Sequence, residues 1–74
     1  MIGREARVAV AVAFRRMRAE ARLVAVTGLG TMTPLLPELD RRREVFTGRS
    51  GSLDPYTAAV ESLTDDIAAG RWVL

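Results

Sequence analysis

Polar and apolar residues in the first third of the chain are sorted with the period of an α-helix. Five arginines fall within about 80° of one another on a helical wheel, and a row of apolar residues lies beside them. Residues 8–14 alternate valine with alanine and so admit a strand, but both residue types are apolar and define no polar face. The pattern predicts a basic N-terminal helix over residues 1–21. The arginines are Arg4, Arg7, Arg15, Arg18 and Arg22, and the apolar row is Val10, Ala13, Phe14, Met17, Ala21 and Val24.

The next segment, residues 23–27, predicts a short buried strand. It reads Leu-Val-Ala-Val-Thr, an apolar and largely β-branched run of the length that buried strands have. Gly28 and Gly30 follow it. Because glycine adopts positive φ at little steric cost, this pair suits a sharp exit from the strand.

A second helix is predicted to begin at one of two prolines. Thr33 followed by Pro34 reads as an N-cap and a first helical position, and Pro37 offers a later start. The helix should run to Phe46 or Thr47 and stop at Gly48.

The last predicted helix has the clearest boundaries. Asp54 can cap it, Pro55 suits its first position and Gly70 follows its end. Its apolar residues recur at helical spacing on one face, and an apolar tail, Trp72-Val73-Leu74, should pack back on the fold. The apolar face is Tyr56, Val60, Leu63 and Ile67, and the acidic residues Glu61, Asp65 and Asp66 lie elsewhere on the wheel.

These elements predict one small domain over residues 1–74. The expected fold class is α/β but mostly helical, in the order helix, short strand, helix, helix, and an all-α bundle is the alternative. Residues 1–21 form the basic helix, residues 22–51 a strand-turn-helix unit, and residues 52–74 the acidic helix and its apolar tail. The chain is 49% apolar but has only one Trp, one Tyr and two Phe. Such a thin core predicts a protein partner or self-association that completes it.

Charge is distributed unevenly along the chain. All eleven basic residues are arginine, against nine acidic residues. Residues 1–26 hold six arginines and two glutamates, whereas residues 50–74 hold one arginine and four acidic residues. Opposite potentials attract, so we expect the acidic end to fold back on the basic end or to associate head to tail.

The composition removes several kinds of chemistry. The chain has no cysteine and no histidine, which excludes disulfides, thiolate zinc sites and the usual catalytic base. A dinucleotide motif would need a third glycine where Thr33 stands. The acidic residues of the last helix have no supporting loop for a metal ion and are expected to form a hydrated face. We expect no cofactor and no metal, and the sequence identifies no small-molecule substrate. With charges interrupting every long apolar run of residues 1–22, no signal peptide or membrane span is expected, and the default location is the cytoplasm.

An ordered set of short motifs resembles the opening of β-ketoacyl-acyl-carrier-protein synthases, the condensing enzymes of fatty-acid and polyketide biosynthesis. The set is Thr27-Gly28-Leu29-Gly30 after an apolar run, then Thr33-Pro34-Leu35, then Gly48-Arg49-Ser50-Gly51, and it covers about residues 22–51. The resemblance implies a strand that leads through a turn into a helix, as in the thiolase-like fold. Leu36-Pro37 and Arg41-Arg42-Arg43 depart from the family pattern. The family's chemistry implies cysteine with histidine or asparagine, and the chain has none of these, so catalysis by this chain alone is not expected.

The expected function is therefore non-catalytic association or scaffolding, linked through the resemblance to polyketide or fatty-acid biosynthesis. The alternative is an arginine-rich binding or assembly module, such as a nucleic-acid-binding regulator or a phage-type structural subunit. No aromatic residues interleave the arginines for base stacking, which favours a protein interface. The residues expected to make the interaction are Arg4, Arg7, Arg15, Arg18, Arg22, Arg41, Arg42, Arg43 and Trp72.

Overall fold

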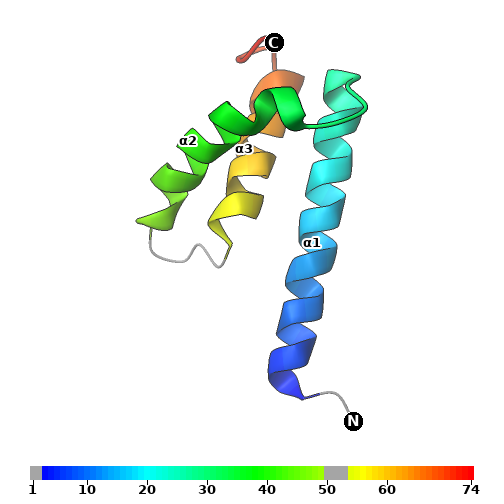
Figure 1. Cartoon of the computed structure of the whole chain (residues 1–74), viewed down its shortest axis with the longest axis vertical. Coiled ribbons are helices and arrows are strands. Elements are labelled where there is room, and N and C mark those ends of the chain that lie inside the picture. The colour runs from blue at the N-terminus through cyan, green and yellow to red at the C-terminus, as the bar shows by residue number, and fades with distance from the viewer. Residues whose placement is uncertain (1–2, 50–53) are drawn as a thin grey trace.

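The computed structural model describes residues 3–49 and 54–74, and every regular element in that part of the chain is a helix. The elements are α1 (Arg4–Thr27), a 3₁₀ turn η1 (Thr33–Leu35), α2 (Leu36–Thr47) and α3 (Pro55–Ala68) (Figure 1). The predicted all-α alternative therefore describes the fold, and the predicted short strand is wrong. Residues 50–53, which include Ser50 and Gly51 of the third motif, lie outside the described residues, as do residues 1–2 of the predicted first helix.

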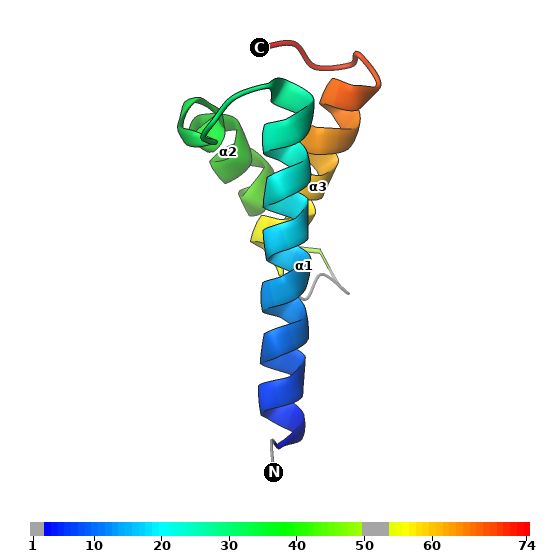
Figure 2. The same cartoon turned by 90° about the vertical axis from the view of Figure 1, so that its right-hand side faces the viewer.

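α3 is the central helix, because it packs against both α1 and α2, whose backbones do not approach each other closely. α1 is the longest element, with 24 residues. Its N-terminal half extends well beyond the ends of the other two helices (Figures 1 and 2). The described chain is consequently elongated, with extents of 44 × 27 × 20 Å.

Residues 23–27 form the last turns of α1 because extending a helix is easier than starting a strand with no strand to pair with. Each added residue gains a backbone hydrogen bond, and Leu23 is fully buried in the core at the helical position. Gly28 then ends the helix with φ of 71°, and its N–H donates to the carbonyl of Val24 at 3.0 Å. The glycine predicted to end a strand therefore ends a helix, by the left-handed C-terminal motif.

The other helix boundaries agree with the sequence except at Thr33, which was predicted as an N-cap but lies inside η1, after the N-cap residue Met32. α2 follows directly from η1, so both predicted prolines lie in the first turn of a helical element, and α2 ends at Thr47 before Gly48. Asp54 caps α3 by accepting a hydrogen bond from the backbone N–H of Tyr56 at 3.1 Å. α3 ends at Ala68, two residues before Gly70.

The core lies where α3 meets α1 and the η1–α2 segment. Its buried cluster consists of Ala19, Leu23, Leu35, Leu39, Val60 and Leu63. Tyr56, Ile67 and Trp72 are partly buried against it, which confirms the predicted apolar face of α3 and the packing of Trp72 on the fold. Val73 and Leu74 remain exposed. From α1 the core takes only Ala19 and Leu23, so most apolar residues of this helix lie elsewhere.

Candidate association surface

Five apolar residues form a continuous row along α1 on the side that no other helix covers. We call this row the outer stripe. Its three large side chains at the N-terminal end are well exposed: Val10 at 48%, Phe14 at 59% and Met17 at 64%. Ala21 is exposed and Val24 half-buried. The members of the outer stripe are Val10, Phe14, Met17, Ala21 and Val24.

The outer stripe is exposed because α1 uses its opposite face for α3. Ala19 and Leu23 face the core. Met17 lies about 160° around the helix from Ala19, since two residues of an α-helix turn through about 200°. α1 stands at the right-hand edge of the bundle in Figure 1 and in front of α2 and α3 in Figure 2, so one side of it meets no other helix.

The contact between α1 and α3 is held by ion pairs at the edge of the small apolar core. Arg15 binds Glu61 and Arg22 binds Asp65, each at 2.9 Å. This confirms that the acidic end folds back on the basic end. The two pairs are half-exposed, so each contributes little to stability, and they lie beside the apolar contact that Ala19 and Leu23 make in the core.

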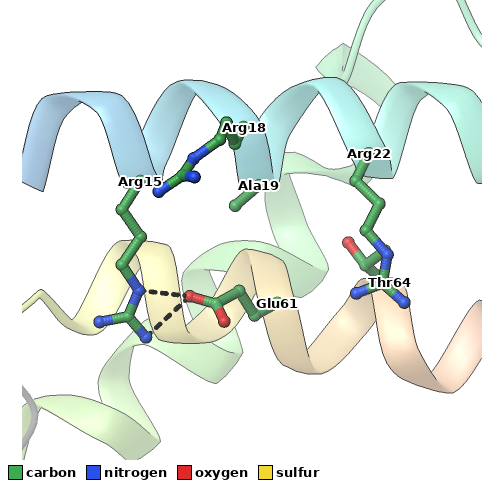
Figure 3. A pocket seen from close by; sticks show the side chains of 6 residues that line it. All are labelled: Arg15, Arg18, Ala19, Arg22, Glu61 and Thr64. Carbon is green, nitrogen blue, oxygen red and sulfur yellow. Dashed lines mark hydrogen bonds and ion pairs between the residues drawn. The ribbon is translucent and has the colours of Figure 1, made fainter.

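Between these pairs lies a shallow hollow lined by arginines of α1. Figure 3 shows Arg15 bound to Glu61 at one end, Arg22 at the other and Arg18 between them. Arg18 has no ion-pair partner among the described residues, and the same is true of Arg4 and Arg7 on the protruding half of the helix. These three arginines form a basic edge beside the outer stripe.

The three consecutive arginines of α2 are distributed among different environments. Arg41 binds Glu38, and Arg43 lies 3.6 Å from Asp40 in an exposed pair. Arg42 is only 12% exposed and joins α2 to α3. The structure therefore gives Arg42 an internal structural role and leaves the charge of Arg41 and Arg43 largely balanced on their own helix.

Glu38 is the most perturbed acidic group of the structure's described residues. Hydrogen bonds from Arg41 and Arg42 lower the pKa of this carboxyl from its ordinary value of 4.5 to about 2. Asp66 receives hydrogen bonds from Arg42 and Arg71, which also lower its pKa. With these lowered pKa values both carboxylates stay ionised and so keep their ion pairs with the arginines. The two carboxylates therefore stabilise the fold.

The acidic residues of α3, which were predicted to form a hydrated face, pair with arginines at the surface, where Glu61 and Asp65 stay partly exposed. Glu61 and Asp65 bind α1, while Asp66 binds Arg42 and Arg71. Among residues 3–49 and 54–74, no three acidic side chains lie close enough together to hold a metal ion. The helices of the same residues include none with the length and apolar character of a membrane span.

The helical wheel placed the residues of the outer stripe in one apolar row. The predicted interaction residues, however, were arginines and Trp72, and none of the stripe residues was among them. The signal was present in residues 8–14, where seven consecutive apolar residues cannot all face one side of a helix. Trp72 is partly covered by the core and offers less free surface than predicted.

Comparison of the chain with protein-family models, with curated proteins and with solved structures found no match.

Proposed function

We propose that this chain is a non-catalytic protein-association module and that its docking surface is the outer stripe of α1. The observation that carries the proposal is the alignment of three half-exposed large apolar side chains, Val10, Phe14 and Met17, along a helix that protrudes from the bundle. Single exposed apolar residues are common on protein surfaces. A continuous row is typical of a surface that another protein covers.

Covering the outer stripe is energetically favourable. Complete burial of a valine, phenylalanine or methionine side chain stabilises by about 1.5–3 kcal/mol. About half of each of Val10, Phe14 and Met17 remains exposed to water. Burying these side chains against a partner would therefore still release about half of that stabilisation.

The surface is also organised before any partner arrives. Ala19 and Leu23 bury one face of α1 against α3, and Arg15 and Arg22 pair with α3 on the same side. A partner would therefore meet a helix that is already formed over the C-terminal half of the stripe, and less ordering would oppose binding.

Site-specific photo-cross-linking tests the proposal. A benzoylphenylalanine placed at Met17 should cross-link to protein in cells of the organism that encodes the chain. The control places the same group at Glu44, an exposed residue of α2. We expect adducts from position 17 and none from position 44. Absence of any protein adduct at position 17 would contradict the proposed function.

The resemblance to condensing enzymes stays a prediction. The strand that it implied over residues 23–27 is helical, and Ser50 and Gly51 of its last motif lie outside the described residues. A link to fatty-acid or polyketide biosynthesis would therefore rest on the order of the motifs, whereas the proposed association function rests on the outer stripe.

A second candidate function is binding of nucleic-acid phosphates by the basic edge. The observation in its favour is that Arg4, Arg7 and Arg18 lie along one side of α1 without an ion-pair partner in the described part of the chain. Binding through phosphates weakens steeply with salt. Fluorescence polarisation with a labelled single strand should then show affinity that falls with added salt and falls further in Arg18→Gln. Affinity that salt does not change would exclude this function.

A further inference from the structure

We infer that the partner covering the outer stripe is a second copy of this chain, aligned in parallel so that the two α1 helices pair as a short coiled coil. This inference rests on the proposed function and specifies its partner. Four observations on α1 carry it: the spacing of the stripe, the charges beside it, the free space around it and its length.

The spacing of the outer stripe is that of a coiled-coil seam. Its residues follow one another at intervals of four, three, four and three, which is the heptad alternation of d and a positions. Val10, Met17 and Val24 take d positions, and Phe14 and Ala21 take a positions. Side chains at this spacing fit best into a helix with the same spacing, and a second copy of α1 provides one. Arg7, at the preceding a position, ends the seam toward the N-terminus.

The face directed at α3 falls outside the seam. Ala19 occupies an f position, the point of the heptad farthest from a coiled-coil partner, and it packs in the core. Pairing through the stripe would therefore leave the contact between α1 and α3 intact. No other helix of the described chain lies along the side of α1 that faces away from α3 (Figure 1).

The charges beside the stripe select the parallel orientation. Arg4 and Arg18 occupy e positions along one edge, whereas the g positions of the other edge hold Ala6, Ala13, Glu20 and Thr27. In a parallel pair, the e edge of each helix faces the g edge of its partner, so Arg4 and Arg18 lie along an edge of alanines and Glu20. Glu20 also binds Arg16 of its own helix at 2.9 Å. In an antiparallel pair with the two Met17 residues opposite each other, the e edge of one helix meets the e edge of the other. The Arg18 side chains of the two copies then lie side by side and repel each other.

The length of the stripe sets the strength of the contact. From Val10 to Val24 the helix rises about 21 Å, or two heptads. Such a contact is at the small end of specific interfaces, so we expect a monomer–dimer equilibrium at about 1–100 µM. Because α3 already holds part of α1 in helical form, two heptads can suffice here although an isolated peptide of this length would not pair.

Sedimentation equilibrium of the purified full chain tests self-association. The chain should show a concentration-dependent rise to twice its monomer mass. Phe14→Glu and Met17→Glu should each weaken the dimer at least about tenfold, since each places a charge in the seam. The matched control is Val8→Glu, the same kind of change at a residue 54% exposed on α1 but outside the stripe, which should leave the dimer unchanged. Circular dichroism of each variant at low concentration should show the helical content of the parent.

An engineered cysteine tests the orientation, and the absence of natural cysteines makes the result unambiguous. Under mild oxidation, Val10→Cys should form a disulfide-linked dimer by itself, because a parallel pair places both copies of residue 10 opposite each other. In a fully overlapped antiparallel pair they would lie about 21 Å apart, too far for a disulfide. Efficient linkage only between Val10→Cys and Val24→Cys chains would overturn the parallel arrangement.

The outcomes separate this inference from the proposed function. A chain that stays monomeric at 100 µM while position 17 cross-links to a different protein would overturn self-association and leave the association function standing. Position 17 adducts at twice the chain mass, together with the dimer in solution, would support both.

Discussion

The guanidinium of Arg42 on α2 and the carboxylate of Asp66 on α3 form an ion pair, with Nη1 and Oδ2 2.7 Å apart. Arg42 also donates to Ser62 Oγ at 2.8 Å and to Glu38 Oε1 at 2.9 Å. This one side chain thus connects two helices whose apolar contact is small. It is mostly buried, and three oxygen partners satisfy its charge, as a buried guanidinium requires.

Replacing Arg42 with methionine should lower the free energy of unfolding by about 2 kcal/mol, because the change breaks a buried ion pair and leaves its carboxylate partners with fewer donors. Urea unfolding followed by circular dichroism measures the change. Arg43→Met is the control, since the pair of Arg43 with Asp40 is long and exposed. Its effect should stay within about 0.5 kcal/mol. Equal effects of the two substitutions would show that the bridge to α3 does not stabilise the fold.

Stability should fall in acid as Glu38 takes up a proton. Its pKa is lowered in the folded chain to about 2, from an ordinary value of 4.5. The stabilisation is therefore fully present above about pH 4.5 and is lost as the pH falls toward 2. Thermal unfolding between pH 2 and pH 7 should show this slope. Glu38→Gln should flatten it, and Glu44→Gln, at an exposed position of the same helix, should not. An unchanged acid slope in Glu38→Gln would mean that other carboxylates carry the effect.

Truncating the centre of α3 should unfold the chain. Leu63 is completely buried, and Leu63→Ala should cost about 2–5 kcal/mol through lost apolar contact and a cavity. A domain of this size has about 3–5 kcal/mol in total, so circular dichroism should show a largely unfolded chain at 25 °C. Val8→Ala removes apolar volume at an exposed position and should leave the melting temperature within a few degrees. A cooperative transition near that of the parent in Leu63→Ala would contradict the assignment of the core.

Gly28→Ala should destabilise the chain by about 1–2 kcal/mol, because the positive φ of 71° at the end of α1 is unfavourable for any residue with a Cβ atom. Gly48→Ala is the matched control. It also follows a helix, but its φ is −86° and an added Cβ would meet no atom within 4 Å. That variant should be neutral or slightly more stable. Thermal melts of both variants test the prediction, which a neutral Gly28→Ala would refute.

The sequence by itself determined α3 and the C-terminal end of α2. Asp54, Pro55 and Gly70 mark the ends of α3 by local backbone chemistry that any fold would share. The opposite charges of the two ends of the chain indicated that these ends attract, but left open folding back or head-to-tail association; the pair of Arg15 with Glu61 shows the first. The helix ends depend on residues close together in sequence, and the attraction between the chain ends depends on the sign of their charges. Both can be predicted without knowing how the helices pack.

Only the tertiary structure decided the state of residues 23–27 and the orientation of α1. Intrinsic preferences separate helix from strand by less than about 1 kcal/mol per residue, so burial of Leu23 outweighs the β-branched residues beside it. α1 carries apolar residues on two opposite faces, and a helical wheel cannot tell which of them meets α3. Packing against the small Ala19, with ion pairs at its edge, selected one face and left Phe14 and Met17 in water.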